Sequence, residues 1–268
     1  MQIHKSLKKQ VHDYWNTASC GTEFIKKEKF TRDYFNAVEE FRYTIEPEIF
    51  SFAQFSRYHG KKVLEVGIGA GTDFIQWLRS GALAYGIDLT QEALDNVHQR
   101  CAQEGLIPQE LSLGDAENLL YPSASFDLVY SWGVIHHSPH TEKALAELVR
   151  VTKPGGTIKY MVYNRRSLFA LYMWLRYGLL KGKPFQTIRT VLANHQESPG
   201  TKAYTFTEAT AMFKDLPVSL VRMQASATAH DLLYYKGKTT RRIAHIIACL
   251  GGWTRVGWFL TIELKRNG

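Results

Sequence analysis

Apolar residues along the middle of the chain occur in short runs that alternate with helical patterns. The run at 63–66 stops at a group of glycines, and apolar residues at helical spacing follow it. The alternation then continues, with further strands expected at 84–89, 111–113, 126–132 and 157–163, and helices at 72–80, 91–104 and 141–152. Strands separated by helices in this way predict a parallel sheet with right-handed crossovers. The expected fold class is therefore α/β, a doubly wound Rossmann-like sheet.

Two kinds of addition flank this alternating core. Residues 1–60 are rich in aromatic side chains and carry helical patterns, so we expect a helical lid segment there. After a K-P-G-G turn at 153–156 and the fifth strand, helical insertions are expected at about 164–200 and 229–255. Between them, Thr205 and Glu208 form a capping box, and a strand is expected at 216–223. A closing strand at 257–264 completes a domain of residues 61–268 that carries both insertions as caps.

The turn after the first strand points to a particular kind of ligand. Gly67, Gly69 and Gly71 allow unusual backbone angles and let a ligand approach the backbone closely. A pyrophosphate-binding turn would read G-x-G-x-x-G, but Thr72 stands in the sixth place. Glu65, at the tip of the strand, would repel phosphate and suits a cationic ligand. The turn therefore argues against a dinucleotide oxidoreductase.

The stretch E-V-G-I-G-A-G at 65–71 resembles motif I of the class I S-adenosylmethionine-dependent methyltransferases, E/D-x-G-x-G-x-G. The family's later motifs follow in order: an acid that ends the second strand, G-D-A at 114–116, F-D-L-V-Y-S-W-G-V-I-H-H at 126–137, and L-V-R-V-T-K-P-G-G at 148–156. The resemblance is to the small-molecule, methyltransferase-11-like members. It implies S-adenosyl-L-methionine as cofactor and a seven-stranded sheet of order 3-2-1-4-5-7-6. The pattern Y-W-N-T-A-S-C-G-T at 14–22 resembles a segment that closes over the cofactor in some members.

The resemblance also implies a role for each matching residue. Glu65 and the backbone of 67–71 would face the methionine end, and Asp88 would accept hydrogen bonds from the ribose hydroxyls. Asp115 would bind the adenine amine, with the backbone N–H of Ala116 beside it. Asp73 would either cap the following helix or meet the cofactor's ammonium. The expected cofactor residues are Tyr14, Trp15, Glu65, Gly67, Gly69, Gly71, Thr72, Asp73, Asp88, Leu89, Asp115, Ala116, Ser131 and Trp132.

His136 and His137 follow the fourth strand, where the family's loop meets the acceptor. Methyl transfer is an in-line displacement, so alignment and electrostatics supply most of the rate. A hydroxyl acceptor also loses a proton, and histidine is the base suited to neutral pH. Both residues are therefore candidate catalytic bases, and the alternative is that they pack against the cofactor or donate to the backbone. The other histidines show no ligand spacing, so no metal is expected.

Charge is distributed unevenly along the chain. Residues 61–160 hold 8 Lys/Arg against 12 Asp/Glu, a net charge of −4, whereas residues 161–268 hold 16 against 5, a net charge of +11. Basic residues there accompany Leu and Trp, as in helices that lie on an anionic membrane. The alternative is a cap over the acceptor pocket, with its basic residues in solvent. RNA is the less favoured partner, because S-W-G-V stands after the fourth strand where an N-P-P-Y amine-methylation motif would be.

These patterns together predict an S-adenosylmethionine-dependent methyltransferase that acts on a small-molecule or lipid-like acceptor, by O- or N-methylation. An RNA methyltransferase and a catalytically silent binding protein on the same fold remain alternatives. We expect a cytoplasmic protein, with membrane association left open, because three dispersed cysteines fit a reduced compartment and no apolar run reaches the roughly 20 residues of a membrane span. The sequence leaves the acceptor and the oligomeric state open.

Overall fold

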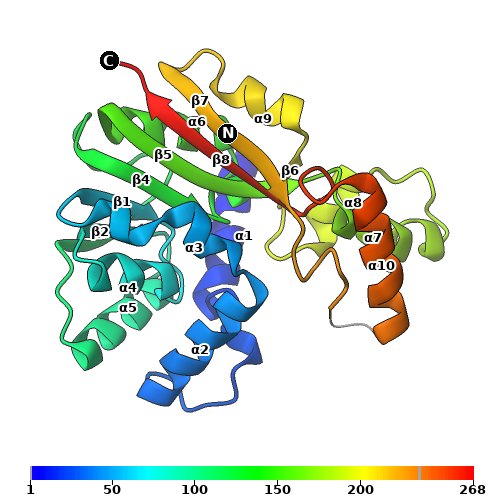
Figure 1. Cartoon of the computed structure of the whole chain (residues 1–268), viewed down its shortest axis with the longest axis horizontal. Helices are drawn as coiled ribbons and strands as arrows, with labels where there is room; N and C mark the ends of the chain where they lie inside the picture. Colours follow the sequence, from blue (N-terminus) through cyan, green and yellow to red (C-terminus); the bar gives the residue numbers. More distant parts are fainter. Residues whose placement is uncertain (1, 235–236) are drawn as a thin grey trace.

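The computed structural model of the chain describes residues 2–234 and 237–268 (Figure 1). Its sheet has the order β3-β2-β1-β4-β5-β8-β7, and the short β6 pairs with β5 outside this path. The β5–β8 and β8–β7 pairs are antiparallel and the others are parallel. The strands are β1 (Lys62–Val66), β2 (Leu83–Asp88), β3 (Glu110–Leu113), β4 (Phe126–Trp132), β5 (Thr152–Asn164), β6 (Ala203–Tyr204), β7 (Val218–Ser226) and β8 (Phe259–Arg266). With β6 set aside, the expected order 3-2-1-4-5-7-6 is confirmed.

Helices cover both faces of the sheet because successive strand residues point to opposite faces. On one face, Val63 and Leu128 pack with α4 and α5, and this core continues into the N-terminal helices and the caps. On the other face, Leu64 and Val129 pack with α6 and α9. The helices are α1 (Gln2–Thr17), α2 (Arg32–Ile45), α3 (Glu48–Ala53), α4 (Thr72–Arg79), α5 (Gln91–Glu104), α6 (Thr141–Val151), α7 (Leu168–Tyr177), α8 (Ile188–His195), α9 (Phe206–Phe213) and α10 (Lys238–Gly251). Short 3₁₀ turns are η1 (Thr22–Phe24), η2 (Phe55–Tyr58), η3 (Ile135–His137) and η4 (Leu179–Lys181).

The expected K-P-G-G turn is built differently from our prediction. It lies inside β5, where the pairing with β4 jumps from Phe126↔Thr152 to Leu128↔Thr157. Residues 153–156 therefore form an irregularity within the strand and not a turn ahead of it. The strand β6 was not predicted, because two residues carry no periodic signal. The capping box at Thr205 is confirmed: its hydroxyl accepts from the backbone of Glu208, whose side chain accepts from Thr205 N–H.

The helices of both insertions, α7, α8 and α10, lie together at one end of the molecule, beside the end of β5 and the start of β8 (Figure 1). One buried carboxylate links parts of both insertions to the sheet. Asp231 accepts backbone N–H groups from Phe169 at 3.1 Å, Thr228 at 2.9 Å and Trp258 at 2.7 Å. It thus joins α7, the second insertion and the entry to β8. Within the described ranges, no helix is long and apolar enough to cross a membrane.

Candidate functional site

The glycine turn between β1 and α4 makes room for a ligand at the carboxyl ends of the strands. Gly67 has φ +84°, and a Cβ there would stand 2.2 Å from Val134 Cγ2, so this position requires glycine. A Cβ on Gly69 would meet nothing within 4 Å, so its backbone borders open space. That space is a cavity of about 480 Å³, in the crevice where open α/β sheets hold their ligands.

Most of the expected cofactor residues line this cavity. They are Trp15, Glu65, Gly67, Gly69, Thr72, Asp73, Asp88, Leu89, Asp115, Ala116 and Trp132. The cavity continues past them to His137 and to residues of the caps, among them Phe169, Glu197 and His230. The glycine turn and the caps therefore border the same space.

Two buried carboxylates, Glu65 and Asp73, line the cavity beside the glycine turn. Glu65 accepts a hydrogen bond from Trp77 Nε1 at 2.8 Å, and Asp73 accepts from the hydroxyls of Tyr43 at 3.0 Å and Tyr130 at 2.9 Å. Burial, and after it the neighbouring Asp73, raise the pKa of Glu65 well above its usual range. The hydrogen bonds of Asp73 go to these two tyrosines, and the capping and ammonium roles both stay predictions. A cationic ligand would relieve the cost of burying both acids.

Asp88 is held at the end of β2 by the turns on either side of it. One carboxylate oxygen accepts from Gly69 N–H at 3.1 Å, and the other accepts from the N–H of Thr90 at 3.0 Å and its hydroxyl at 2.9 Å. Thr90, not Asp88, caps α5. The carboxylate is therefore fixed in the cavity wall with accepting capacity left for ligand hydroxyls.

Asp115 has a partner that the sequence did not predict. Lys8, from α1, contacts Asp115 at 2.5 Å and Glu117 at 2.9 Å. The N-terminal helix is thus tied to the loop after β3, at the edge of the cavity. Further along α1, the Trp15 ring meets His137 edge-on, with centroids 5.3 Å apart. The N-terminal segment therefore contributes to the cavity wall.

Four expected residues lie outside the cavity lining. Tyr14 is 44% exposed and packs against Trp15. Gly71 faces α5, where a Cβ would stand 2.7 Å from Val97 Cγ2. Ser131 is fully buried and donates to the Val66 carbonyl at 3.0 Å, because it points to the other face of β4 from Trp132. The fourth is His136. Of the two candidate catalytic histidines, His137 is the one that lines the cavity and can contact an acceptor.

His136 is buried between His137 and Tyr163, with ring centroids 4.2 and 4.1 Å away. Neither of its ring nitrogens has a hydrogen-bond partner among the described residues. Burial, with smaller contributions from the charges of His137 and Lys202, lowers the pKa of His136 well below its usual value. The imidazole is therefore neutral at physiological pH.

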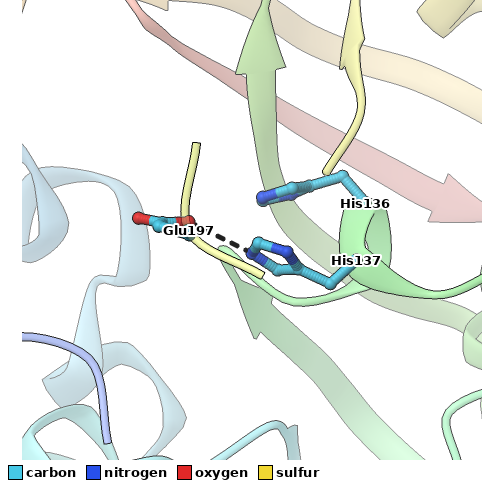
Figure 2. Close-up of side chains that lie close together, drawn as sticks. All are labelled: His136, His137 and Glu197. Carbon is cyan, nitrogen blue, oxygen red and sulfur yellow. Dashed lines mark ion pairs between the residues drawn. The ribbon is translucent and has the colours of Figure 1, made fainter. Parts of the chain in front are cut away.

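Glu197, from the first insertion, is the site residue that sequence reasoning missed. Its carboxylate accepts the Tyr163 hydroxyl at 2.8 Å and lies 3.3 Å from His137 Nε2 (Figure 2). No motif marks it, since the fold alone brings residue 197 to residue 137. Its backbone has φ +53°, an uncommon value for a residue other than glycine. We expected no metal from sequence spacing, but His136, His137 and Glu197 offer ligand atoms within 4.8 Å of one another.

Comparison with known proteins agrees with this geometry. Residues 64–159, from β1 into β5, match the family model of the methyltransferase domain. The chain carries a class I S-adenosylmethionine-dependent methyltransferase domain. The acids and the open backbone of the glycine turn fit S-adenosylmethionine, which the domain match also supports as the cofactor.

Individual relatives share this methyltransferase domain. The phthiotriol/phenolphthiotriol dimycocerosates methyltransferase of Mycobacterium tuberculosis strain H37Ra is 39% identical over 103 residues, which are 38% of this chain and 37% of the relative. The ubiquinone biosynthesis O-methyltransferase of Azoarcus sp. is 32% identical over 120 residues, 44% of this chain and 50% of the relative. The chain thus matches less than two thirds of the length of either protein.

Among solved structures, the magnesium protoporphyrin IX methyltransferase of Synechocystis, determined with bound SAH, superposes with a TM-score of 0.60. The match covers 97% of this chain and 100% of that one at 14% identity, which shows the shared fold. The α/β Rossmann-like class predicted from the hydrophobic pattern is therefore confirmed.

Proposed function

We propose that this protein transfers the methyl group of S-adenosylmethionine to a small-molecule or lipid-like acceptor, on oxygen or nitrogen. The observation that carries the proposal is the single cavity that joins the glycine turn to the caps. Bound there, the cofactor supplies an activated methyl group on a cationic sulfur. Glu65 and Asp73 favour its positive charge, and Asp88 positions its ribose.

The far part of the cavity has the chemistry of an acceptor site. Its wall there is largely aromatic, with Tyr163, Phe169 and Phe259 next to His137 and Glu197. An apolar wall with a few polar groups binds an organic acceptor and orients its reactive atom. The relatives named for dimycocerosates and for ubiquinone biosynthesis support a lipid-like acceptor. His137 and Glu197 are polar groups in this wall that can contact the reactive atom of the acceptor.

The test is a mass-spectrometric search for products that gain CH₂ when small-molecule, lipid and RNA fractions are incubated with enzyme and cofactor. A gain in the small-molecule or lipid fraction is the expected result, and a gain in RNA alone would support the RNA methyltransferase alternative. Binding of S-adenosylhomocysteine without any product would support the silent binding protein. Thermal stabilisation by NADH in place of S-adenosylhomocysteine would contradict the cofactor assignment.

A second proposal concerns α10, which exposes its large apolar side chains and buries small ones, unlike an ordinary surface helix. Small residues, Ala244 and Ala248, face the protein and are buried. The large apolar side chains, at spacings i, i+3, i+4 and i+7, are exposed: Ile243, Ile246, Ile247 and Leu250. Arg241 and Arg242 lie in the first turns of the same helix. An apolar stripe with adjacent cations fits peripheral contact with an anionic membrane, which would also supply a lipid-like acceptor.

Vesicle flotation tests this contact. We expect binding to vesicles that contain anionic lipid, weakened by salt and by the double substitution Arg241→Glu with Arg242→Glu. The matched control, Lys214→Glu with Arg222→Glu, makes the same charge change outside α10 and should bind as the wild type does. Absence of binding to any vesicle would refute the proposal. A dimer that Ile246→Asp converts to monomer would assign the stripe to a second copy of the chain.

A further inference from the structure

The cluster of His136, His137 and Glu197 contains a close contact between an imidazole nitrogen and a carboxylate oxygen. Figure 2 shows both imidazoles extending from η3 in the same direction, toward the segment that carries Glu197. His137 Nε2 and a Glu197 oxygen are 3.3 Å apart. Whether this contact is favourable depends on where the proton of His137 lies.

Two hydroxyls contact the opposite ring nitrogen, Nδ1. His137 Nδ1 lies 2.8 Å from Ser198 Oγ and 3.0 Å from Thr201 Oγ1. Thr201 donates its hydroxyl hydrogen to the Ser198 carbonyl at 2.7 Å, so its oxygen is available to accept from His137 Nδ1–H. In the tautomer with its hydrogen on Nδ1, His137 presents the Nε2 lone pair to the Glu197 carboxylate. In that tautomer the two acceptors repel each other unless a cation lies between them.

His136 provides a second, independent observation. Its side chain has no exposed surface, and both its nitrogens lack a hydrogen-bond partner in the described part of the chain. A buried polar group without a partner is costly and uncommon in folded proteins. Its neighbours across the ring stack are His137 and Tyr163. The Tyr163 hydroxyl is directed to Glu197, so it does not satisfy His136.

We propose that His136, His137 and Glu197 bind a first-row divalent metal ion on the acceptor side of the cavity. Two imidazoles and one carboxylate are a donor set used for zinc and for ferrous iron, and three protein ligands leave coordination positions open. His137 and Glu197 line the cavity, so the open positions face the acceptor space. The proposal concerns metal binding alone and goes beyond the proposed methyl transfer.

The geometry and the outer contacts both fit this proposal. With metal–ligand bonds of about 2.0–2.2 Å, neighbouring ligand atoms lie roughly 3–3.5 Å apart, and the His137–Glu197 separation of 3.3 Å falls in this interval. All the ligand atoms of the cluster lie within 4.8 Å of one another. Ser198 and Thr201 hold the far nitrogen of His137, and Tyr163 holds Glu197, as outer partners of metal ligands do.

A bound metal ion and a His137 base would use the same nitrogen, so the two roles exclude each other. The competing account of the cluster is an imidazolium–carboxylate pair, in which Nε2 carries a second proton and no metal binds. The two accounts differ in a measurable way, because only one of them predicts stoichiometric affinity for a divalent cation.

The experiment is calorimetric titration of the full chain, freed of metal by a chelator, with Zn²⁺, without cofactor or acceptor. We expect one site per chain, with affinity lowered by more than about 100-fold in Glu197→Gln, since loss of an outer contact alone costs about 10–100-fold. Thr201→Val, which removes such an outer contact, should fall within that smaller range. Co²⁺ should give a visible absorption band that Glu197→Gln abolishes.

The matched control addresses the exposed pair of His245 and Cys249, which lie 3.6 Å apart on α10. His245→Gln should leave the affinity and the stoichiometry unchanged. Wild-type affinity in a folded Glu197→Gln variant, loss of the site in His245→Gln, or no binding of Zn²⁺ or Co²⁺ would each overturn the proposal. Binding of S-adenosylhomocysteine, measured separately, tests the proposed function, so failure of one assay does not imply failure of the other.

Discussion

Replacement of Asp88 gives the sharpest test of the cofactor site, and the structure decides which replacement to use. Asp88→Ala would leave the N–H groups of Gly69 and Thr90 without their acceptor. At about 1 kcal/mol for each lost hydrogen bond, the glycine turn itself would be destabilised by roughly 2 kcal/mol. A loss of affinity in that variant would therefore mix a damaged turn with a missing ribose partner.

Asp88→Asn separates the two effects better. The amide keeps the shape and one acceptor oxygen, so the cost in stability should be near 1 kcal/mol. It removes the charge that would strengthen hydrogen bonds to two ribose hydroxyls, a loss of roughly 1.5–3 kcal/mol in binding. We therefore expect the dissociation constant of S-adenosylhomocysteine to rise by about 10- to 150-fold.

Isothermal titration calorimetry with S-adenosylhomocysteine measures this change, and urea denaturation shows whether the variant is folded. The matched control is Asp95→Asn, on the exposed side of α5, where Asp95 accepts a hydrogen bond from Gln91 at 2.8 Å. The control should bind as the wild type does. A folded Asp88→Asn protein with wild-type affinity would remove Asp88 from the ribose site and refute the reasoning.

Three further predictions concern the contacts around the site. Lys8→Met removes two carboxylate contacts worth about 1 kcal/mol, so hydrogen exchange should quicken about fivefold in α1 but not in α6, and unchanged exchange in α1 would contradict the lid contact. Burial opposes ionisation of Glu208, but hydrogen bonds from Arg165 and the Thr205 backbone outweigh it and hold its pKa at about 2. Wild type should therefore be more stable than Glu208→Gln, as measured by urea denaturation, with the full difference above pH 5 and none as the pH falls toward 2. A full difference that persists at pH 2 would contradict this role of the ionised Glu208 carboxylate. Asp231→Ala leaves three backbone N–H groups without an acceptor and should cost about 3 kcal/mol in unfolding free energy, so a loss below about 1 kcal/mol would show that those groups find other partners.

The fold was largely predictable because its elements have strong periodic signals. The bounds of α5 and β4 agree with the sequence prediction to the residue. Their apolar residues recur at 3.6 and 2 positions, and Thr90 and Gly105 mark both ends of α5. Because side chains alternate along β4, Ser131 and Trp132 must face opposite sides of the sheet. Only one of them could therefore line the cavity, although the family motif led us to expect both there.

The site was predictable only where a motif is continuous in sequence. The glycine turn, Asp88 and Asp115 were found in this way, and all but Gly71 line the cavity. Lys8 reaches Asp115 across 107 positions, and Glu197 reaches His137 across 60, so no local pattern could indicate either contact. The burial of His136 likewise depends on Tyr163 from another strand. Such contacts follow from the packing of segments whose relative placement is a property of the whole fold.

The position of β8 has a consequence for how the chain acquires this fold during synthesis. β8 emerges after β7, yet it lies between β5 and β7 and is the strand to which β7 pairs. Until residues 259–266 have left the ribosome, the edge of β5 is uncovered and β7 has no place in the sheet. Open strand edges invite pairing with other chains. The nascent protein therefore remains vulnerable to aggregation after most of the cavity wall has been made, and Phe259, the first residue of β8, reaches that wall only when the sheet closes.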